Sequence, residues 1–489
     1  MAYKKEDAEI LSRHVSNLDR DIYALHSLPP EVISVLFAYV SRSPNSFRDN
    51  LLKLLKEGSI SPGSTAKPDY SAAEKKASAF HKKWVVGFGH KSVAEHSVCS
   101  LALENVSILA SKSIEDSRLA AFTEKSTRYQ VFDRTKYCKP REIMESRHSE
   151  RYEQVMNSLF DFYTESQEKM LEFMRSKHPR SQEMSERFYE SLTKAGVCDV
   201  LRYALPASTL TNIGMTCNAR EWEHVVVKLL SHPLSEMNSI AEQMKRECSG
   251  ILPTLLKAAA KSGYLLDTEK RMLSFSKRYS PQPQERKPVE LVHSDFLAEE
   301  KIVAAALYRY SQHSFTRCLA QAKKMGAEEK ERVLEEFVKG LGGERLPREF
   351  EHSYFTFDIL VDFGAFRDIQ RHRMCTQTTQ LLTCDHGFSV PEEMKECGLA
   401  ESFSEKMQEA KNLFDSMRKE LPFATQYCVP LAFRKRLLLT WNLRELWHFI
   451  KLRSGKAGHE SYRKVAKQCY AEMKEKHPLL AKYLSVTSD

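Results

Sequence analysis

The sequence predicts a helix-rich fold that also contains strands, built as two copies of one unit. Two long amphipathic stretches, 150–174 and 402–421, predict helices. Apolar and polar residues alternate after each of two Glu-His-Ser triplets, at 95–97 and 351–353, which predicts a half-buried strand after each. The alternating apolar residues are Cys99, Leu101 and Leu103 after the first triplet, and Phe355, Phe357, Ile359 and Val361 after the second.

A second set of matches lies near the C-terminal end of each copy. Six ordered matches that follow a matching strand favour a diverged tandem duplication. The polar segment 279–287 contains two prolines and predicts a linker, so we expect one domain at 1–280 and another at 288–489. The segment between the motifs is longer in the first copy. The matched residues are Pro206, Thr216, Asn218, Arg220, Glu221 and His224 with Pro430, Thr440, Asn442, Arg444, Glu445 and His448.

Composition places the chain among ordinary globular proteins. Its 489 residues are 42% hydrophobic and 28% charged, which excludes wholesale disorder. No stretch approaches the ~20 apolar residues of a membrane span, and the N-terminus has no apolar secretory region, so we expect a cytoplasmic protein. Eleven cysteines without a CxxC pair indicate reduced thiols and predict no metal site. The net charge of +9 fits either plain solubility or an anionic ligand such as a nucleotide or nucleic acid.

Three short motifs are candidates for binding or chemistry. Arg371-His372-Arg373 ends a stretch that we expect to be helical, where three successive side chains fan over roughly 200° and clamp a phosphate or an electron-rich ring. The alternative is a solvated basic surface. On the expected loop 124–129, Ser126 and Arg128 lie two residues apart and both reach a phosphate or a base edge. The alternative there is an ordinary polar loop.

The third motif is a helix that begins near Asn442 and reaches Arg453. They are eleven residues apart, which makes about three turns, so both side chains share one face about 16 Å apart. A packed helix with ion-paired ends is the alternative. The first copy keeps Asn218 but has Leu229 in place of the arginine. His90, ahead of Ser92, is either a site residue or a loop histidine.

In this order the motifs resemble the flavin-dependent thymidylate synthase family (ThyX). That family carries spaced histidines before a strand, then R-H-R, S-x-R-Y, an arginine before Leu-Pro, and N-x-R on a helix that ends in arginine. The resemblance implies an α+β fold with an antiparallel sheet and long helices. It also implies sites between subunits of a homotetramer, which bind FAD and dUMP, take a methylene group from methylenetetrahydrofolate, and use NADPH as reductant without a cysteine nucleophile.

Each copy departs from the family pattern in a different place. R-H-R is intact only in the second copy, where the first has Asp116-Ser117-Arg118. S-x-R-Y is intact only in the first, and Leu381-Leu382-Thr383-Cys384 replaces it in the second. The position that matches Arg202 holds Gln426 in the second copy, and the position that matches Arg453 holds Leu229 in the first copy. We therefore expect one composite site, assembled from the surviving half of each copy, and one defunct site.

The resemblance also implies roles for individual residues. Glu124, Ser126 and Arg128 would frame dUMP, with Arg128 and Arg202 on its phosphate. Arg453 would contact the uracil edge, which makes Arg453 and Ser126 the catalytic candidates. Arg371, which would also lie near the nucleotide, would hold FAD with the other cofactor residues: His372, Arg373, Asn442, Arg444, His448, His90 and Ser92. Asn218 and Arg220 would be the equivalents from the other copy.

The leading function is therefore FAD-dependent conversion of dUMP to dTMP with methylenetetrahydrofolate and NADPH. Two chains would associate as a homodimer that imitates the tetramer. One alternative is a flavoenzyme that acts on another pyrimidine nucleotide. The other is a non-catalytic protein that binds nucleotides or RNA through its basic surface.

Overall fold

The computed structural model describes residues 3–39, 43–56, 70–87, 91–279, 287–342, 345–456 and 458–486. Internal contacts divide the chain into two compact units. Unit 1 comprises Met1–Val106, Ser113–Lys125 and Thr211–Ser280, and unit 2 comprises Ser107–Lys112, Ser126–Leu210 and Pro281–Asp489. The first copy thus contributes segments to both units. The predicted linker 279–287 lies outside the described residues except at its two ends, and the domain boundaries drawn from it stay a prediction.

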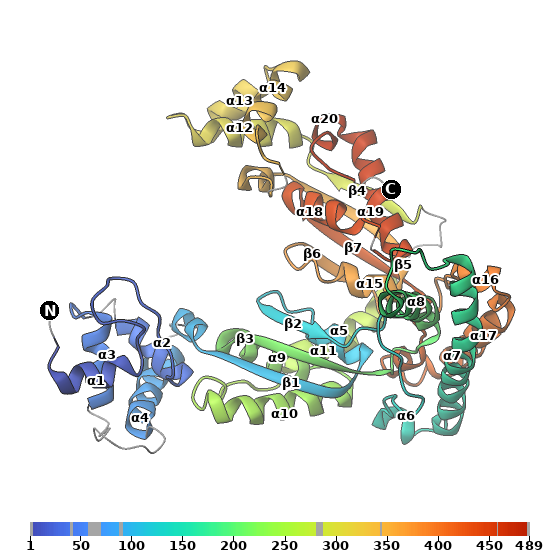
Figure 1. Cartoon of the computed structure of the whole chain (residues 1–489), viewed down its shortest axis with the longest axis horizontal. Helices are drawn as coiled ribbons and strands as arrows, with labels where there is room; N and C mark the ends of the chain where they lie inside the picture. Colours follow the sequence, from blue (N-terminus) through green and yellow to red (C-terminus); the bar gives the residue numbers. More distant parts are fainter. Residues whose placement is uncertain are drawn as a thin grey trace. The chain divides into compact units, whose positions relative to one another are not determined.

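Unit 1 joins a bundle of short N-terminal helices to a three-stranded sheet of order β1-β3-β2. The helices bury a common apolar cluster that includes Leu11, Val35 and Leu51 (Figure 1). Its elements are α1 (Lys5–Ser12), α2 (Pro30–Tyr39), α3 (Phe47–Lys56), α4 (Ser71–Phe80), η1 (His81–Gly87), η2 (Lys91–His96), β1 (Val98–Ser107), β2 (Ala120–Glu124), β3 (Leu210–Asn218), α9 (Ala219–Leu230), α10 (Ser235–Ile251) and α11 (Gly263–Ser276).

The strand predicted after the first triplet is confirmed as β1. Cys99 and Leu103 are buried on one side, and Leu101 is half-buried between them. The alternation ends at Asn105, whose φ of 54° is in the left-handed region that few side chains adopt. Val106 and Ser107, although adjacent, are both buried as a result. α5 (Ile108–Ile114) follows directly, where the chain passes between the two units.

Unit 2 contains a four-stranded antiparallel sheet of order β4-β5-β7-β6, with long helices (Figure 1). α18 and α19 pack against β7, β4 and β5. Its elements are α6 (Arg141–Met144), α7 (Ser149–Lys177), α8 (Glu186–Leu201), η3 (Arg202–Ala204), β4 (Val289–Ser294), α12 (Ala298–Arg309), α13 (Phe315–Ala322), α14 (Ala327–Val338), η4 (Arg348–His352), β5 (Tyr354–Asp362), α15 (Phe363–Ile369), β6 (Thr376–Thr379), α16 (Glu392–Glu396), α17 (Ala400–Met417), η5 (Ala424–Cys428), β7 (Arg434–Asn442), α18 (Leu443–Arg453), α19 (Glu460–Lys476) and α20 (Pro478–Ala481).

The predicted strand and helices of unit 2 are also confirmed. In β5, Phe355, Phe357 and Ile359 are fully buried on one face, as period-2 alternation requires. The stretch 150–174 forms α7, whose buried residues recur every three or four positions. The stretch 402–421 forms α17, which ends at Met417 rather than at residue 421.

The order of elements repeats along the chain, which agrees with a tandem α+β arrangement. The first copy carries α7 and α8 where the second has α17 alone. The series β1-α5-β2-α6-α7-η3-β3-α9-α10 recurs as β5-α15-β6-α16-α17-η5-β7-α18-α19. Matching backbone hydrogen bonds recur as well: Ile108 to Thr209 and Leu109 to Ala207 in the first copy, Phe363 to Phe433 and Gly364 to Leu431 in the second.

Within unit 2 the two copies meet at equivalent residues. Pro206 and Pro430 occupy the same position in their copies, and they form an antiparallel bridge with each other. Beside it, the Ala207 amide donates to the Val429 carbonyl and the Leu431 amide to the Leu205 carbonyl, each at 2.9 Å. Contact between equivalent residues is what a two-fold axis produces, so the bridge marks a local pseudo-two-fold. Across the described ranges, the structure contains no helix with both the length and the apolar character that a membrane span requires.

Candidate functional site

The Glu-His-Ser triplet and the N-x-R-E motif contact each other in both copies. Arg444 Nη1 pairs with Glu351 Oε1 at 2.7 Å, and its Nε donates to the Leu346 carbonyl at 2.6 Å. In unit 1, Arg220 pairs with Glu95 in the same way. In both copies the arginine of one motif pairs with the glutamate of the other, so each motif holds the other in position.

Asn442 and Asn218 have a structural role that the sequence analysis did not assign. Each is the N-cap of a helix, α18 or α9, and its side-chain oxygen accepts the backbone N–H of Glu445 or Glu221 at 2.9 Å. Asparagine is among the best N-cap residues because its oxygen satisfies an otherwise unpaired helix donor. The predicted helix from Asn442 to Arg453 is thus confirmed, since α18 begins after the cap and ends at Arg453.

The S-x-R-Y segment forms the predicted loop and lies at the start of a unit 2 segment. Ser126 Oγ accepts the backbone N–H of Arg128 at 3.1 Å, which closes a tight turn. Thr127, between them, is buried, and its hydroxyl accepts a hydrogen bond from Arg367 Nη1 at 2.8 Å. Arg367 belongs to α15 of the second copy, four residues before the R-H-R motif, so the S-x-R-Y loop contacts the helix that leads into that motif.

Arg128 and Arg202 share one carboxylate. Arg128 Nε donates to Asp199 Oδ1 at 2.9 Å, and Arg202 Nε lies 3.2 Å from the same oxygen. Burial by itself lowers the pKa of Arg128, but the Asp199 charge outweighs it and raises that pKa above the usual value. Arg202 is 1% exposed, and within the described ranges its Nη2 has no hydrogen-bond partner. A buried guanidinium with an unused donor can accept an anionic ligand.

The expectation that Arg371-His372-Arg373 lies on a helix is wrong. α15 ends at Ile369, and the three residues form a turn before β6. Gln370 holds the start of this turn, because its Nε2 donates to the backbone carbonyl of Lys112 at 2.8 Å. Arg371 is exposed, whereas His372 is buried. The side chains therefore diverge because of the turn and not through helical rotation.

Arg453, at the end of α18, contacts the same turn. Its Nε donates to His372 Nε2 at 3.0 Å, and its Nη2 donates to the Asp368 carbonyl at 2.8 Å. His372 Nε2 is thus an acceptor, which places the ring proton on Nδ1, 3.6 Å from Glu445 Oε1. Burial lowers the pKa of His372, and the nearby Arg453 charge acts in the same direction, so the ring is neutral at pH 7.

Asp368 is the point on which these arginines converge. Burial would raise the pKa of this carboxyl group, but four guanidinium groups outweigh burial and lower it below the usual value. Arg453 Nη1 lies 3.7 Å from the carboxylate oxygen Oδ1 of Asp368. We call the four residues the arginine cluster: Arg128 and Arg202 from the first copy, Arg371 and Arg453 from the second.

Comparison with known proteins identifies the fold family. The profile of the family described as "Thymidylate synthase complementing protein" matches residues 33–254 and 290–479. The chain belongs to this family. The match covers both copies of the unit, and it confirms the resemblance drawn from the motifs.

Relatives of the chain are of two kinds. A UPF0159 protein of Chlamydia muridarum (strain MoPn / Nigg) is 35% identical over 503 aligned residues, which cover 99% of this chain and 95% of that protein. A UPF0159 protein of Thermoplasma acidophilum is 28% identical and covers 84% and 89% of the two chains. A flavin-dependent thymidylate synthase of Sulfolobus acidocaldarius is 30% identical over 172 residues, 35% of this chain and 57% of that one. The family and these relatives support an enzyme of the thymidylate synthase kind.

The structure does not bring every predicted residue into the arginine cluster. His90 lies outside the described residues. Ser92, in η2, and Glu124, the last residue of β2, belong to unit 1. Arg373 is half-buried in the turn, and the ring of His448 lies 5.6 Å from that of His372.

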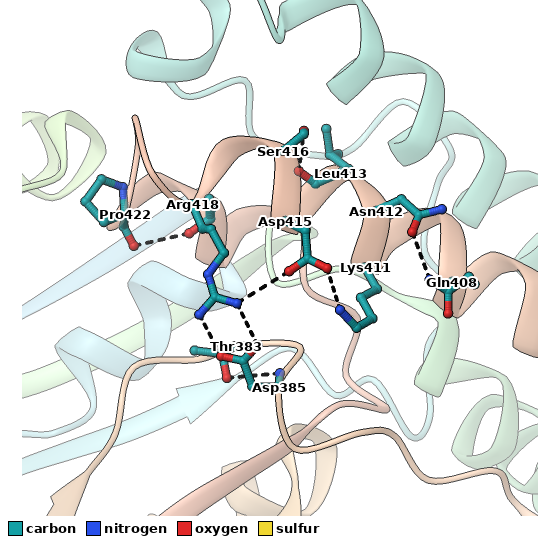
Figure 2. Close-up of polar contacts among 11 residues, drawn as sticks. Thr383, Asp385, Gln408, Lys411, Asn412, Leu413, Asp415, Ser416, Arg418 and Pro422 are labelled. Carbon is teal, nitrogen blue, oxygen red and sulfur yellow. Dashed lines mark hydrogen bonds and ion pairs between the residues drawn. The ribbon is translucent and has the colours of Figure 1, made fainter. Parts of the chain in front are cut away.

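In the second copy, buried side chains of the chain itself fill the place that matches the S-x-R-Y half. Leu382 and Cys384 are buried there, and the amide oxygen of Gln426, the counterpart of Arg202, accepts the Leu382 backbone N–H at 3.0 Å. Figure 2 shows how Asp385 ties this loop to α17, through two hydrogen bonds from Arg418 at 2.7 and 2.8 Å. The first copy has Arg128 and Arg202 in this place. The second copy instead uses the Gln426 side chain to bind its own backbone N–H.

Four contacts of the predicted residues were missed by the sequence analysis: Asp199, Asp368, His459 and Tyr462. The two aspartates carried a usable signal, because each precedes a cluster arginine by three residues on a helix or at its end. His459 and Tyr462, at the start of α19, belong to no motif. Burial, followed by the Arg202 charge, lowers the pKa of His459.

Proposed function

We propose that the chain is an FAD-dependent thymidylate synthase that converts dUMP to dTMP with methylenetetrahydrofolate and NADPH. The site is composite, and both copies contribute to it. The observation that carries the proposal is the arginine cluster, whose members come from both copies and act on the same half-buried carboxylate. A protein that only needed two stable domains has no use for this concentration of positive charge, which includes the buried Arg202.

The charge balance of the cluster suits a phosphate monoester. The four guanidinium groups outnumber Asp199 and Asp368, the two carboxylates on which they act. His372 and His459 add none at neutral pH, because burial lowers the pKa of both. Arg128 and Arg202 would hold the phosphate, and the unpartnered Nη2 of Arg202 is the donor that the ligand would use. Ser126 would contribute chiefly by holding the turn that carries Arg128.

The residues of the R-H-R turn fit a cofactor that is both anionic and aromatic. Arg371 offers an exposed cation for a pyrophosphate, and His372 presents a neutral ring whose orientation Arg453 fixes. Bound FAD would supply the redox chemistry of the methyl transfer. Arg453 would orient the uracil edge and stabilise negative charge on it, an electrostatic role. His448 lies beside His372 and remains a cofactor candidate, whereas Asn442 and Arg444 already serve the cap and the Glu351 pair.

The decisive experiment measures flavin content and product together. The purified protein is assayed for bound FAD, for a change in its visible spectrum on addition of dUMP, and for dTMP formation with methylenetetrahydrofolate and NADPH. About one FAD per chain and dUMP-dependent turnover support the proposal. Light scattering on the same sample tests the expected homodimer. A protein that takes up no FAD contradicts the proposal and favours a nucleotide or RNA binder, whose affinity would fall steeply with salt.

Variants test whether the site is composite. Arg371→Ala and Ser126→Ala alter different copies, so each should abolish or strongly reduce turnover if both halves form one site. Arg418→Ala, in the second copy's filled place, is the matched control and should keep full activity. Activity that survives both Arg371→Ala and Ser126→Ala would show that the composite site is wrong. Turnover of another pyrimidine nucleotide in place of dUMP would keep the site and change the substrate.

A further inference from the structure

The first turn of α19 lies against the arginine cluster. Tyr462 is 3% exposed, and its hydroxyl accepts a hydrogen bond from Arg128 Nη1 at 3.3 Å. The guanidinium carbon of Arg453 lies 5.3 Å from the centre of the same ring, within the range of a cation–π contact. One side chain thus touches an arginine from each copy.

The absence of a side chain at Gly458 leaves room for this ring. A Cβ atom at residue 458 would lie 2.5 Å from Cε2 of Tyr462 and 3.0 Å from its hydroxyl oxygen. The first separation is shorter than real Cβ contacts and the second is tight, so a larger residue at 458 must shift the buried ring. The tyrosine is therefore confined by the glycine at its edge and by the arginines at its hydroxyl and its face.

The contacts of Arg128 show what this confinement does. Its Nε is bound to Asp199 and its Nη1 to Tyr462, so two acceptors define the plane of the guanidinium group. A planar donor group binds a phosphate well only when that plane is set in advance, because reorientation costs side-chain entropy. The guanidinium group of Arg453 lies over the ring of the same side chain. Tyr462 thereby sets the separation between the two cations.

We propose that Tyr462 is a positioning residue, which aligns Arg128 and Arg453 so that they bind the two ends of one nucleotide. This rests on the proposed function, in which Arg128 holds the phosphate and Arg453 the base. Tyr462 itself acts through the arginines and takes no part in the chemistry. The hydroxyl serves the phosphate end through a hydrogen bond, and the ring serves the base end through its face.

Two substitutions separate these contributions. Tyr462→Phe keeps the ring and removes the acceptor for Arg128, so the dUMP Kd and KM should rise about tenfold, the worth of one charge-assisted hydrogen bond, while kcat changes less than about twofold. Tyr462→Leu also removes the ring beneath Arg453, so kcat should fall as well. Tyr470→Phe makes the same chemical change on the same helix, away from these contacts, and should behave as wild type.

A double-substitution cycle tests the link through the glycine. Gly458→Ala alone should raise the dUMP KM, because it displaces the ring, but should add little in the Tyr462→Leu background, where the ring is absent. Bound FAD and Tm, measured for every variant, report on folding. If the role of Tyr462 were purely structural, its substitution would lower Tm and FAD content in parallel with activity. Tyr462→Phe and Tyr462→Leu would then not differ in whether KM or kcat changes.

The outcomes distinguish this inference from the proposed function. Wild-type protein that neither binds dUMP nor turns it over overturns the proposed function and, with it, the role of Tyr462. Wild-type protein that binds dUMP, together with a Tyr462→Phe variant that binds it equally well, overturns only the positioning role. Additive effects of Gly458→Ala and Tyr462→Leu would likewise contradict it. A selective rise in the dUMP KM of Tyr462→Phe supports it.

Discussion

Replacement of Asp368 by asparagine should destabilise the free protein and strengthen its response to phosphate. The carboxylate is the shared counterion of the arginine cluster, and its side chain is 14% exposed. At the 3.7 Å separation from Arg453 Nη1, Coulomb attraction at an effective dielectric of about 20 is about 4 kcal/mol. Desolvation of the carboxylate offsets part of that, so we expect a net loss of about 2–3 kcal/mol from the free energy of unfolding.

The assay is urea unfolding followed by circular dichroism, at pH 7, with and without inorganic phosphate. Because the variant leaves four cations against Asp199 alone, phosphate should stabilise it more than wild type. Asp415→Asn is the control. Asp415 contacts Lys411 and Arg418 on α17 with 40% of its side chain exposed, so its loss should cost about 0.5 kcal/mol or less and leave the phosphate response unchanged.

The pH dependence gives an independent check of the same reasoning. The pKa of Asp368 is lowered in the folded protein, so its contribution to stability is full above the unfolded pKa of about 3.9 and disappears as the pH falls through the lower folded value. The asparagine variant should therefore lose less stability between pH 4 and pH 2 than wild type does. A variant as stable as wild type at pH 7, and no more responsive to phosphate, would refute the convergence of the arginines on Asp368.

Three further substitutions test other parts of the site. His459→Asn replaces the Nδ1 atom that accepts the Ser461 N–H with an amide oxygen, which cannot titrate. Because burial lowers the folded pKa of His459, wild type should lose stability as the pH falls below about 6.5, and the variant should lose less, as measured by Tm against pH. Arg453→Lys removes the donor fork that serves His372 and Asp368, so kcat should fall about tenfold or more with FAD still bound; unchanged turnover would remove Arg453 from the chemistry. Gln426→Ala leaves the buried Leu382 N–H unpaired and should cost about 1–3 kcal/mol in chemical denaturation, with kcat and KM unchanged; a loss of activity would mean that the filled place still serves the reaction.

Much of the fold could be predicted from sequence because its signals are local. Period-2 alternation identified β1 and β5, and the spacing of apolar residues identified α7 and α17. The helix from Asn442 to Arg453 was predicted from the sequence, and its asparagine cap was seen only in the structure. In each case the deciding interactions lie within a few residues of one another, so the pattern is visible in the chain itself.

The site was harder to predict because its contacts join distant segments. The R-H-R residues lie in a turn whose start is held by the hydrogen bond from Gln370 to the Lys112 carbonyl. The two residues are more than 200 positions apart in the chain, so no local sequence pattern predicts this bond. Tyr462 lies 334 residues from Arg128, and only the packing of α19 brings them together. The motifs were informative as pairs, but the roles of Asn442 and Arg444 could not be separated from capping and ion pairing without coordinates.

The bridge between Pro206 and Pro430 has a consequence for how the chain can change over time. In a dimer of identical subunits every substitution enters twice, once on each side of the axis. Here the two sides are encoded separately, so a substitution such as arginine to glutamine at position 426 alters one side and spares Arg202 on the other. Because both sides belong to one chain, they also meet at an effective concentration that dilution cannot lower. In a fused pair of this kind, one of two equivalent sites can be lost and its residues can be replaced by residues that pack. The two copies still associate at any protein concentration.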